Sequence, residues 1–358
     1  MNDDNKDILN ILQDAENKAH RFAAQALIIQ PGAIGDCILT LPLAESLKTH
    51  FGIGTCLMLG RSNYIEYFPG RTCVDGIKNL DSVDLHRLFI EHKGFELEDD
   101  DSLISAFAGF RHIITFLDSA GSDFETNLTF TAYCSNPTDV TTLQLKPSAD
   151  FTSHIAGFYL DSFVTAQHPD TRPADKSVSC NLRKAYITPG KSDLTHGRKI
   201  LESVGVKPGR NIVVIHPGSG GVSKCWHIDN FYMLAEQLCD KDIKVVFLLG
   251  PAEMERFGKK TIDALGVVAP VLCELSLTET FQAVSCANCF IGNDSGITHL
   301  AAAAGIPTIA CFGPTDPAQY GPVGPLVSTF KFEASDFNSP CPDKIEDVTK
   351  QILKYLNS

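Results

Sequence analysis

The most constraining feature of the sequence is a pattern that recurs along the chain. A short, fully apolar run is followed by a glycine-rich turn, and the turn is followed by apolar residues at helical spacing. An unbroken apolar run is typical of a parallel strand that is buried on both faces, and parallel strands need crossover helices between them. The alternation therefore predicts an α/β protein with doubly wound parallel sheets.

The first half of the chain contains one clear β-α-β unit, followed by less regular sequence. The expected elements are a strand at 26–30, a glycine turn at 31–36, a helix that ends at Gly52, a second strand at 55–60, a third strand at 112–118 and an amphipathic helix at 154–164. Residues 1–24 are expected to form a short, acidic helical extension. The stretch 165–193 has three prolines among many polar residues, so it is expected to be a linker.

The second half repeats the alternation more completely. Strands are expected at 211–216, 244–250, 288–294 and 308–313, and helices at 230–240, 251–265, 277–287, 295–305 and 345–356. The expected architecture is two Rossmann-like domains that face each other across a cleft. The expected boundaries are 1–24 for the N-terminal extension, 25–180 for the first domain, 181–340 for the second domain and 341–358 for a closing helix.

The net charge limits the partners that we expect. A formal charge of −13 argues against a nucleic-acid-binding protein, which usually carries a basic face. The charge is also uneven, because residues 1–180 carry 13 Lys and Arg against 25 Asp and Glu, whereas residues 181–358 carry 17 against 18. The two halves are therefore expected to bind different partners.

The composition is typical of a soluble globular protein. Apolar residues make up 44% of the chain, which excludes disorder as its main state, and no apolar run approaches the roughly 18 residues of a membrane span. The acidic N-terminus lacks the apolar core of a signal peptide, so a cytoplasmic protein is expected. Twelve cysteines in such a chain do not indicate a disulfide framework, and the lone C-x-x-C of Cys286 and Cys289 is interpreted as the start of a strand without a metal.

Glycine turns at the carboxyl ends of the expected strands are the candidate binding elements, because open α/β sheets bind ligands there. The first turn, at 31–36, opens a helix whose N-terminus favours an anion. The turn is not G-x-G-x-x-G, and no acidic residue ends the second strand, so a nicotinamide cofactor is not favoured. The spacing leaves two interpretations of Asp36 open, a helix cap and a catalytic carboxylate.

The second turn, at 216–221, is followed closely by Lys224. A glycine loop with a nearby lysine suits a diphosphate, although a solvent-exposed loop lysine is the alternative interpretation. No Ser-His-Asp motif, HExxH motif or Walker lysine is present. The acidic run at 99–101 follows no strand and is interpreted as a solvated loop, so no metal-bridged diphosphate site is indicated.

The third turn, at 292–299, again follows an expected strand and opens a helix. Asp294, Ser295 and Gly296 are expected where free backbone N–H groups point out of the sheet. His299 lies in the first helical turn and has both a structural and a binding interpretation. The loop at 312–317 is interpreted as a ligand-lining loop.

Taken together, the blocks at 27–47, 213–238 and 290–317 resemble glycosyltransferase family 9, the ADP-heptose:lipopolysaccharide heptosyltransferases. The motifs that carry the resemblance are PGAIGD, HPGSGGVSKCW, GNDSGITH and FGPTDP, in that order. Two positions depart from the family pattern, Cys225, where a basic residue is frequent, and His227, where proline is usual.

The resemblance implies a GT-B fold whose first domain binds the acceptor and whose second domain binds the nucleotide sugar. It implies an inverting transfer that needs neither a metal nor another cofactor, with Asp36 as the general base and Lys224 stabilising the leaving diphosphate. The implied donor contacts are Gly218, Ser219, Glu253 at the ribose, Leu275 at the adenine, Asp294, Ser295, Gly296 and His299. The implied acceptor-side turn consists of Gly32, Ala33, Ile34 and Gly35.

The expected partners are ADP-heptose and a glycolipid or saccharide acceptor of the lipopolysaccharide-core type, and a lipid acceptor implies peripheral contact with the inner face of the inner membrane. Three alternatives stay open. They are a transferase of the same family with another nucleotide sugar or another acceptor, a nucleotide-sugar 2-epimerase on the same fold, and a non-catalytic binding protein. The acidic first half favours an acceptor other than the usual anionic lipid core.

Overall fold

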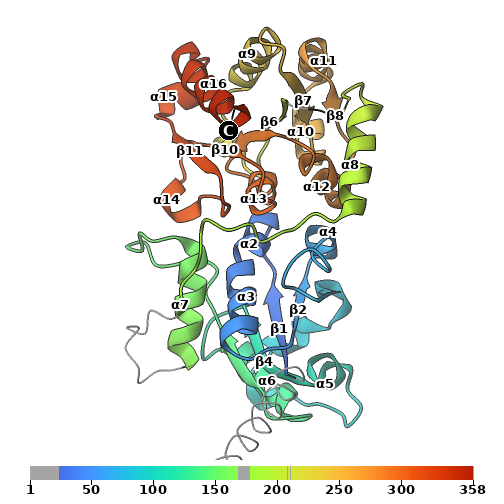
Figure 1. Ribbon diagram of the computed structural model, residues 1–358. Coiled ribbons are helices and arrows are strands. Elements are labelled where there is room, and N and C mark those ends of the chain that lie inside the picture. The colour runs from blue at the N-terminus through green and yellow to red at the C-terminus, as the bar shows by residue number, and fades with distance from the viewer. Residues whose placement is uncertain (1–23, 168–177, 208, 210, 358) are drawn as a thin grey trace, which may run out of the picture. The chain divides into compact units, whose positions relative to one another are not determined.

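The computed structural model describes residues 24–167, 178–207, 209 and 211–357. By its contacts the chain divides into two units, each built around one parallel β-sheet (Figure 1). Of the described residues, the first unit comprises 24–32, Thr40–Pro147 and Gly157–Cys180, and the second comprises Ala33–Leu39, Ser148–Ala156 and Asn181 onward. The extension expected at 1–24 lies, except for Ala24, outside the described residues, and so does the middle of the expected linker, 168–177.

The first unit has a five-stranded sheet in the order β3-β2-β1-β4-β5, with every pair parallel. Its strands are β1 (Gln25–Gln30), β2 (Thr55–Gly60), β3 (Gly76–Asn79), β4 (Phe110–Thr115) and β5 (Asp139–Thr142). Five of the six β1 residues are buried, as the unbroken apolar run predicts. The chain starts its sheet in the middle and builds outward on both sides, which is the doubly wound pattern.

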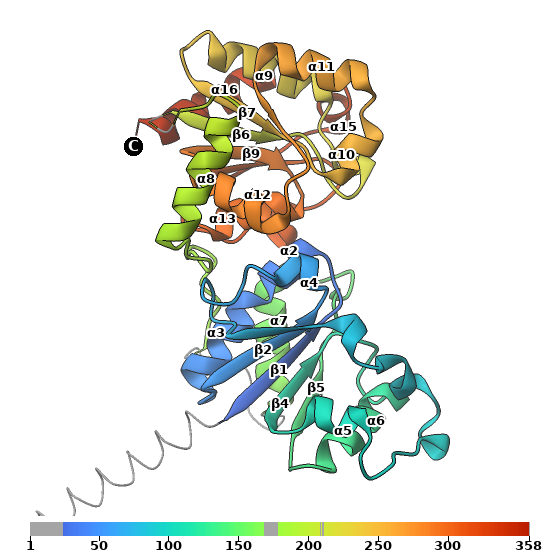
Figure 2. The same cartoon turned by 90° about the vertical axis from the view of Figure 1, so that its right-hand side faces the viewer.

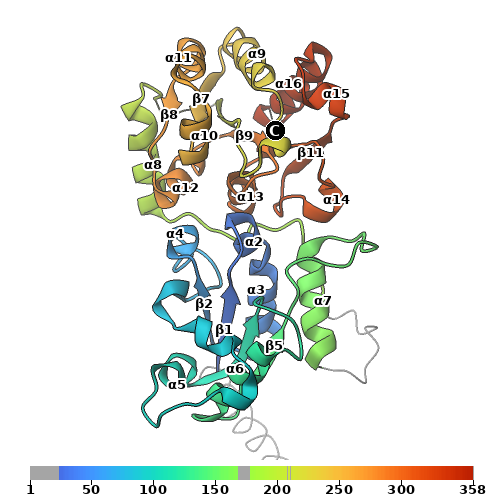
Figure 3. The same ribbon diagram turned by 180° about the vertical axis from the view of Figure 1, so that it is seen from behind.

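Helices cover both faces of this first sheet. They are α3 (Leu41–His50), α4 (Ser62–Ile65), α5 (Ser102–Phe107), α6 (Asp123–Tyr133) and α7 (Ile155–Gln167), with short 3-10 turns at Leu80–Ser82, Leu85–Phe89 and His92–Gly94. The helices α3 and α7 lie on one face (Figure 1), and α5 and α6 lie on the other (Figure 3). Leu27 and Ile29 of β1 pack in the core on the α5 and α6 side.

The second unit has a six-stranded sheet in the order β11-β10-β9-β6-β7-β8, again parallel throughout. Its strands are β6 (Ile212–His216), β7 (Lys244–Leu248), β8 (Val271–Leu272), β9 (Cys289–Asn293), β10 (Thr308–Phe312) and β11 (Val327–Lys331). The three central strands β6, β9 and β10 are buried along their whole length. The four strands expected in this half are confirmed.

Helices also cover both faces of the second sheet (Figure 2). They are α8 (Lys191–Ser203), α9 (Ile228–Cys239), α10 (Pro251–Arg256), α11 (Lys259–Val268), α12 (Leu277–Val284), α13 (Gly296–Ala303), α14 (Pro317–Tyr320), α15 (Ala334–Phe337) and α16 (Pro342–Leu356), with a 3-10 turn at Val222–Lys224. The helices α9, α11 and α16 lie on one face, and α8, α12 and α13 lie on the other. The amphipathic helix expected at 345–356 is confirmed in α16, which buries Ile345, Val348 and Ile352.

The helix expected between the first turn and Gly52 is two helices, α2 (Ile34–Leu39) and α3. Pro42 causes the break, because proline lacks an N–H and its ring would meet the carbonyl four residues earlier. The break lies between the two units, because α2 belongs by its contacts to the second unit and α3 to the first. This assignment brings the turn around Asp36 into the second unit.

Two other differences from the sequence expectation have local causes. The helix expected at 251–265 is interrupted, because Phe257 adopts an extended conformation and Gly258 starts a new helix, α11. The strands β3, β5, β8 and β11 were not predicted, because all four lie at the edges of their sheets, are only partly buried and therefore lack a long unbroken apolar run. Within the described part of the chain, no helix has both the length and the apolar character to cross a membrane.

Candidate functional site

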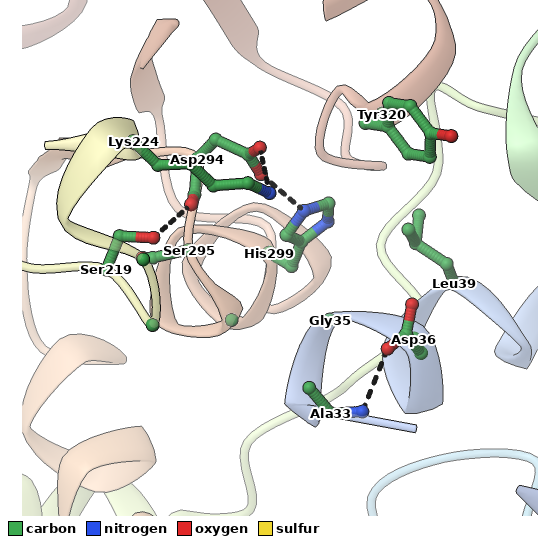
Figure 4. A pocket seen from close by; sticks show the side chains of 13 residues that line it. Ala33, Gly35, Asp36, Leu39, Ser219, Lys224, Asp294, Ser295, His299 and Tyr320 are labelled. Atoms are coloured by element: carbon green, nitrogen blue, oxygen red, sulfur yellow. Dashed lines mark hydrogen bonds and ion pairs between the residues drawn. The ribbon is translucent and has the colours of Figure 1, made fainter. Parts of the chain in front are cut away.

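A pocket of about 310 Å³ lies in the second unit, where the first turn meets the carboxyl ends of β6 and β9. The residues that line it are Ala33, Gly35, Asp36, Leu39, Ser219, Gly220, Gly221, Lys224, Asp294, Ser295, Gly296, His299 and Tyr320. Figure 4 shows Lys224, Asp294 and His299 grouped together, with Asp36 of α2 facing this group and Tyr320 above Leu39. All three glycine turns that the sequence singled out therefore contribute to one pocket.

Asp36 lies in the first turn of α2 and lines the pocket. Its Oδ2 accepts a hydrogen bond of 2.8 Å from the backbone N–H of Ala33, the residue before the helix. The carboxylate thus satisfies one of the N–H groups left free at a helix start, which is a capping contact. The two interpretations that the sequence left open are compatible, because the capping bond fixes a carboxylate that also faces the pocket.

Asp294 contacts several polar side chains at the pocket. Its Oδ2 accepts hydrogen bonds of 2.7 Å from Lys224 Nζ and of 2.7 Å from Thr315 Oγ1, and its Oδ1 lies 3.8 Å from His299 Nε2. Burial by itself raises the pKa of the Asp294 carboxyl, but the hydrogen bonds and positive charge from His299 and Lys224 outweigh burial and hold that pKa well below its usual range. Asp294 is therefore an ionised carboxylate that fixes the position of Lys224.

The two turns of the second unit are tied together below the pocket. The hydroxyl of Ser219 donates a 2.7 Å hydrogen bond to the carbonyl oxygen of Asp294. Asn293, at the end of β9, donates through Nδ2 to the carbonyl of Pro217 at 2.8 Å and accepts through Oδ1 from the backbone N–H of Trp226 at 2.9 Å. Because both turns share these bonds, Lys224 and the start of α13 keep a defined relative position.

Helix α13 begins at the pocket. Ser295 is its N-cap, and its hydroxyl oxygen accepts from the backbone N–H of Thr298 at 3.3 Å. The remaining free N–H groups of the first turn carry partial positive charge, which favours an anion at this end of the helix. His299 is 4% exposed, and its Nδ1 has no hydrogen-bond partner within the described residues.

Two glycines allow α2 and α13 to approach each other closely. A Cβ atom at Gly296 would lie 2.7 Å from Ile34 Cβ, and one at Gly35 would lie 3.3 Å from the His299 ring. Real Cβ atoms do not approach this closely without displacing their neighbours. The small residues of the two turns therefore set the distance between Asp36 and the Asp294 group.

Five of the predicted site residues do not line the pocket. Ile34 packs against Gly296, and the backbone N–H of Gly32 donates to Gln30 Oε1 at 3.0 Å. Leu275 lies just before the N-cap of α12. Glu253 is 3% exposed, its Oε2 accepts from the N–H of Gly250 at 2.9 Å, and its other oxygen lies directly beneath Gly218.

Five residues in or next to the pocket were not among the predicted site residues. Gly220 and Gly221 belong to the second turn, and Thr315 belongs to the loop expected to line a ligand site, so for these residues the signal was present. Leu39 and Tyr320 carried no such signal, because neither belongs to a glycine turn. Only the packing of α2 and α14 brings them to the pocket.

No group of three or more His, Cys, Asp and Glu side chains lies in a position to hold a metal ion anywhere in the described ranges. The C-x-x-C of Cys286 and Cys289 leads into a strand, as the sequence predicted, because β9 begins at Cys289. Cys289 is buried in β9, and Cys286 Sγ donates to the carbonyl of Leu194 at 3.4 Å.

Comparison with protein families and known proteins gives a consistent result. The family model described as glycosyltransferase family 9 (heptosyltransferase) matches residues 174–346. Lipopolysaccharide heptosyltransferase 3 of Escherichia coli is 26% identical over 298 residues, which cover 79% of this chain and 81% of that protein. Lipopolysaccharide heptosyltransferase 2 of Escherichia coli K12 is 31% identical over 163 residues, 42% of this chain and 47% of that protein.

Solved structures show the same architecture. The ADP-heptose heptosyltransferase II of E. coli superimposes with a TM-score of 0.67 at 16% identity, over 92% of this chain and 99% of that chain. The E. coli heptosyltransferase WaaC with ADP has a TM-score of 0.59 at 15% identity, again over 92% and 99% of the two chains. These likenesses confirm the expected α/β fold of the GT-B class.

Proposed function

We propose that this chain, whose residues 174–346 match the model of glycosyltransferase family 9 (heptosyltransferase), transfers heptose from ADP-heptose to a saccharide acceptor of the lipopolysaccharide-core type. One observation supports the proposal above the others. A single pocket contains a fixed carboxylate, Asp36, and a fixed ammonium group, Lys224, on different turns. Inverting sugar transfer needs a base and a diphosphate-stabilising cation on opposite sides of the anomeric carbon.

In the proposed reaction, Asp36 takes the proton from the acceptor hydroxyl as that oxygen attacks the anomeric carbon. The bond between the anomeric carbon and the diphosphate oxygen breaks, and the electron pair leaves with ADP. Lys224 and the free N–H groups at the start of α13 stabilise the charge that develops on the diphosphate. Asp294 assists by holding Lys224 in place through a 2.7 Å hydrogen bond.

The remaining donor contacts are also proposals. Ser219, Ser295, Gly296 and His299 line the pocket and are proposed to contact the diphosphate and the sugar. The ribose and adenine contacts at Glu253 and Leu275 stay predictions. A metal-independent transfer is also a prediction, and it is checked by measuring turnover before and after exhaustive chelation, which should leave the rate unchanged.

The donor assignment is tested by thermal shift with ADP, UDP and GDP at equal concentrations. A ligand that binds only the folded protein raises the melting temperature by mass action, and a ligand at about 100 times its Kd adds roughly 2.7 kcal/mol of stability. We expect ADP to raise the melting temperature and UDP and GDP to have much smaller effects. A larger shift with UDP or GDP would replace the proposed donor.

The acceptor is tested separately, by following ADP release from ADP-heptose in the presence of different saccharides.

One observation favours a second candidate function, transfer to a neutral acceptor. The first half of the chain carries a formal charge of −12, which repels an anionic core. Release of ADP with neutral saccharides but not with phosphorylated core acceptors would support this second candidate.

A further inference from the structure

Arg256, the last residue of α10, has a guanidinium group that the reaction described above does not use. Its Nη1 donates to the carbonyl oxygen of Ser219 at 3.2 Å and lies 3.6 Å from Cys225 Sγ. No carboxylate of the described residues forms an ion pair with it. Burial raises the pKa of the Cys225 thiol despite the nearby arginine, so the thiol stays neutral and does not pair with the guanidinium as a thiolate.

The contact with Ser219 has a consequence for the pocket. Ser219, Gly220 and Gly221 line the pocket, whereas Arg256 does not. In a planar trans peptide the C=O and the following N–H point in opposite directions. Because the Ser219 carbonyl points toward Arg256, the N–H of Gly220 points away from Arg256.

The turn has a second support on the same helix. Glu253 lies directly beneath Gly218, and Arg256 holds the next residue along the chain, Ser219. The Ser219 hydroxyl is in turn bonded to the carbonyl of Asp294. Helix α10 therefore supports the turn from outside the pocket, and the turn connects α10 to the Asp294 group.

We propose that Arg256 is a positioning residue for the diphosphate of the nucleotide donor. It orients the Gly220 N–H into the pocket and places a positive charge behind the turn. The ligand class is a nucleoside diphosphate, so the inference rests on the proposed donor. A phosphate group that accepts from the Gly220 N–H and lies near this charge binds more tightly than one that meets only Lys224.

The test compares Arg256→Met, Arg256→Gln and Arg256→Lys with the wild-type protein in calorimetric titrations with ADP and AMP. We expect Arg256→Met to weaken ADP binding about tenfold and AMP binding much less, because the lost contacts act on the diphosphate. Arg256→Lys, which keeps the charge and a donor, should retain most of the affinity. Arg256→Gln, which keeps a donor without the charge, should lie between the two.

The matched control is Lys260→Met, which removes one positive charge from an exposed position on α11. It should bind ADP like the wild-type protein. Melting temperatures show whether each variant is folded. If Arg256→Met does not fold, the comparison with the wild-type protein is made with Arg256→Gln. ADP binding within twofold of wild type in the folded Met or Gln variant would refute the role of Arg256, and so would an equal loss for AMP and ADP. A wild-type protein that binds no ADP would instead refute the proposed donor.

Discussion

At the scale of single residues, the pocket is organised by carboxylates rather than by its cations. Asp294 receives two hydrogen bonds at one oxygen and lies near His299 with the other. Asp36 receives the N–H of Ala33. Both side chains therefore have fixed positions before any ligand binds, and such preorganisation lowers the cost of reaching the transition state.

The proposed base is tested by Asp36→Asn. The amide oxygen can still accept from the Ala33 N–H, so the helix start and the fold should be kept, while the group can no longer take a proton. We expect ADP to bind with unchanged affinity and turnover to fall by a factor of about 10² to 10⁴. Asp229→Asn, at an exposed position in the first turn of α9, is the control and should keep full activity. Turnover near the wild-type rate in Asp36→Asn would remove Asp36 as the base.

The Asp294 carboxylate should make a pH-dependent contribution to stability. Its pKa is lowered in the folded protein, so its contribution is fully present above the unfolded pKa of about 3.9 and is lost as the pH falls through the folded pKa. The free energy of unfolding of the wild-type protein minus that of Asp294→Asn should shrink as the pH falls from about 5 to below about 4. Denaturant titrations of both proteins across this range measure it. A difference that grows as the pH falls below about 5 would contradict the ionised Asp294 carboxylate.

At the scale of elements, the site depends on the contact between two short helices, α2 and α13. Neither helix is long enough to be stable alone, so packing determines where each one starts. The packing is possible because glycine occupies the closest points on both helices. The consequence for function is that Asp36 reaches the pocket only if α2 stays against α13.

Gly296→Ala tests this contact directly. The added methyl group would lie 2.7 Å from Ile34 Cβ, so α2 or α13 must move. We expect the free energy of unfolding to fall by about 1–3 kcal/mol and turnover to fall by roughly tenfold to a hundredfold, because small displacements of reacting groups are costly.

The control for this variant is Gly157→Ala in α7, where an added Cβ has no neighbour within 4 Å. That variant should be at least as stable as the wild-type protein, because alanine is the better helix former, and it should keep its activity. An unchanged turnover in Gly296→Ala would show that the distance between α2 and α13 does not matter for the reaction.

At the scale of the whole molecule, charge separates the two halves of the sequence. The second half is nearly neutral, and its pocket is proposed to attract anions through local groups, namely Lys224, turn N–H groups and a helix N-terminus. The first half has an excess of 12 acidic residues. Long-range fields of this kind act on the encounter with a charged acceptor, and salt screens them.

The KM values of two acceptors should therefore respond differently to salt. Raising the ionic strength from about 0.02 to 0.15 M shortens the screening length to about 8 Å. The KM of a phosphorylated acceptor should fall by about twofold to fivefold, because repulsion is reduced, whereas the KM of a neutral saccharide should not change. Initial rates measured with both acceptors at fixed ADP-heptose check this. A KM for the phosphorylated acceptor that rises with salt would indicate a basic acceptor site instead.

Much of the fold could be predicted from the sequence, because strand burial and turn conformation depend on residues that are close together in the chain. Central strands such as β1, β6 and β9 are apolar over most of their length because they are buried on both faces, so their own residues indicate a central position in the sheet. Glycine turns at their carboxyl ends mark where a ligand approaches the backbone. The family resemblance and the α/β fold follow from these elements and are confirmed.

What the sequence by itself determined, then, is the set of central strands, the turns that follow them and the family resemblance. Only the tertiary structure decided which of the turns share a pocket. It also decided that α2 belongs to the second unit, through its contacts with α13, and that Arg256 and Tyr320 lie beside the site. The physical reason is that strand burial and turn conformation depend on neighbouring residues in the chain. The contacts of Asp294 with Lys224 and Thr315, or of Arg256 with Ser219, join residues far apart in sequence and exist only once the helices are packed.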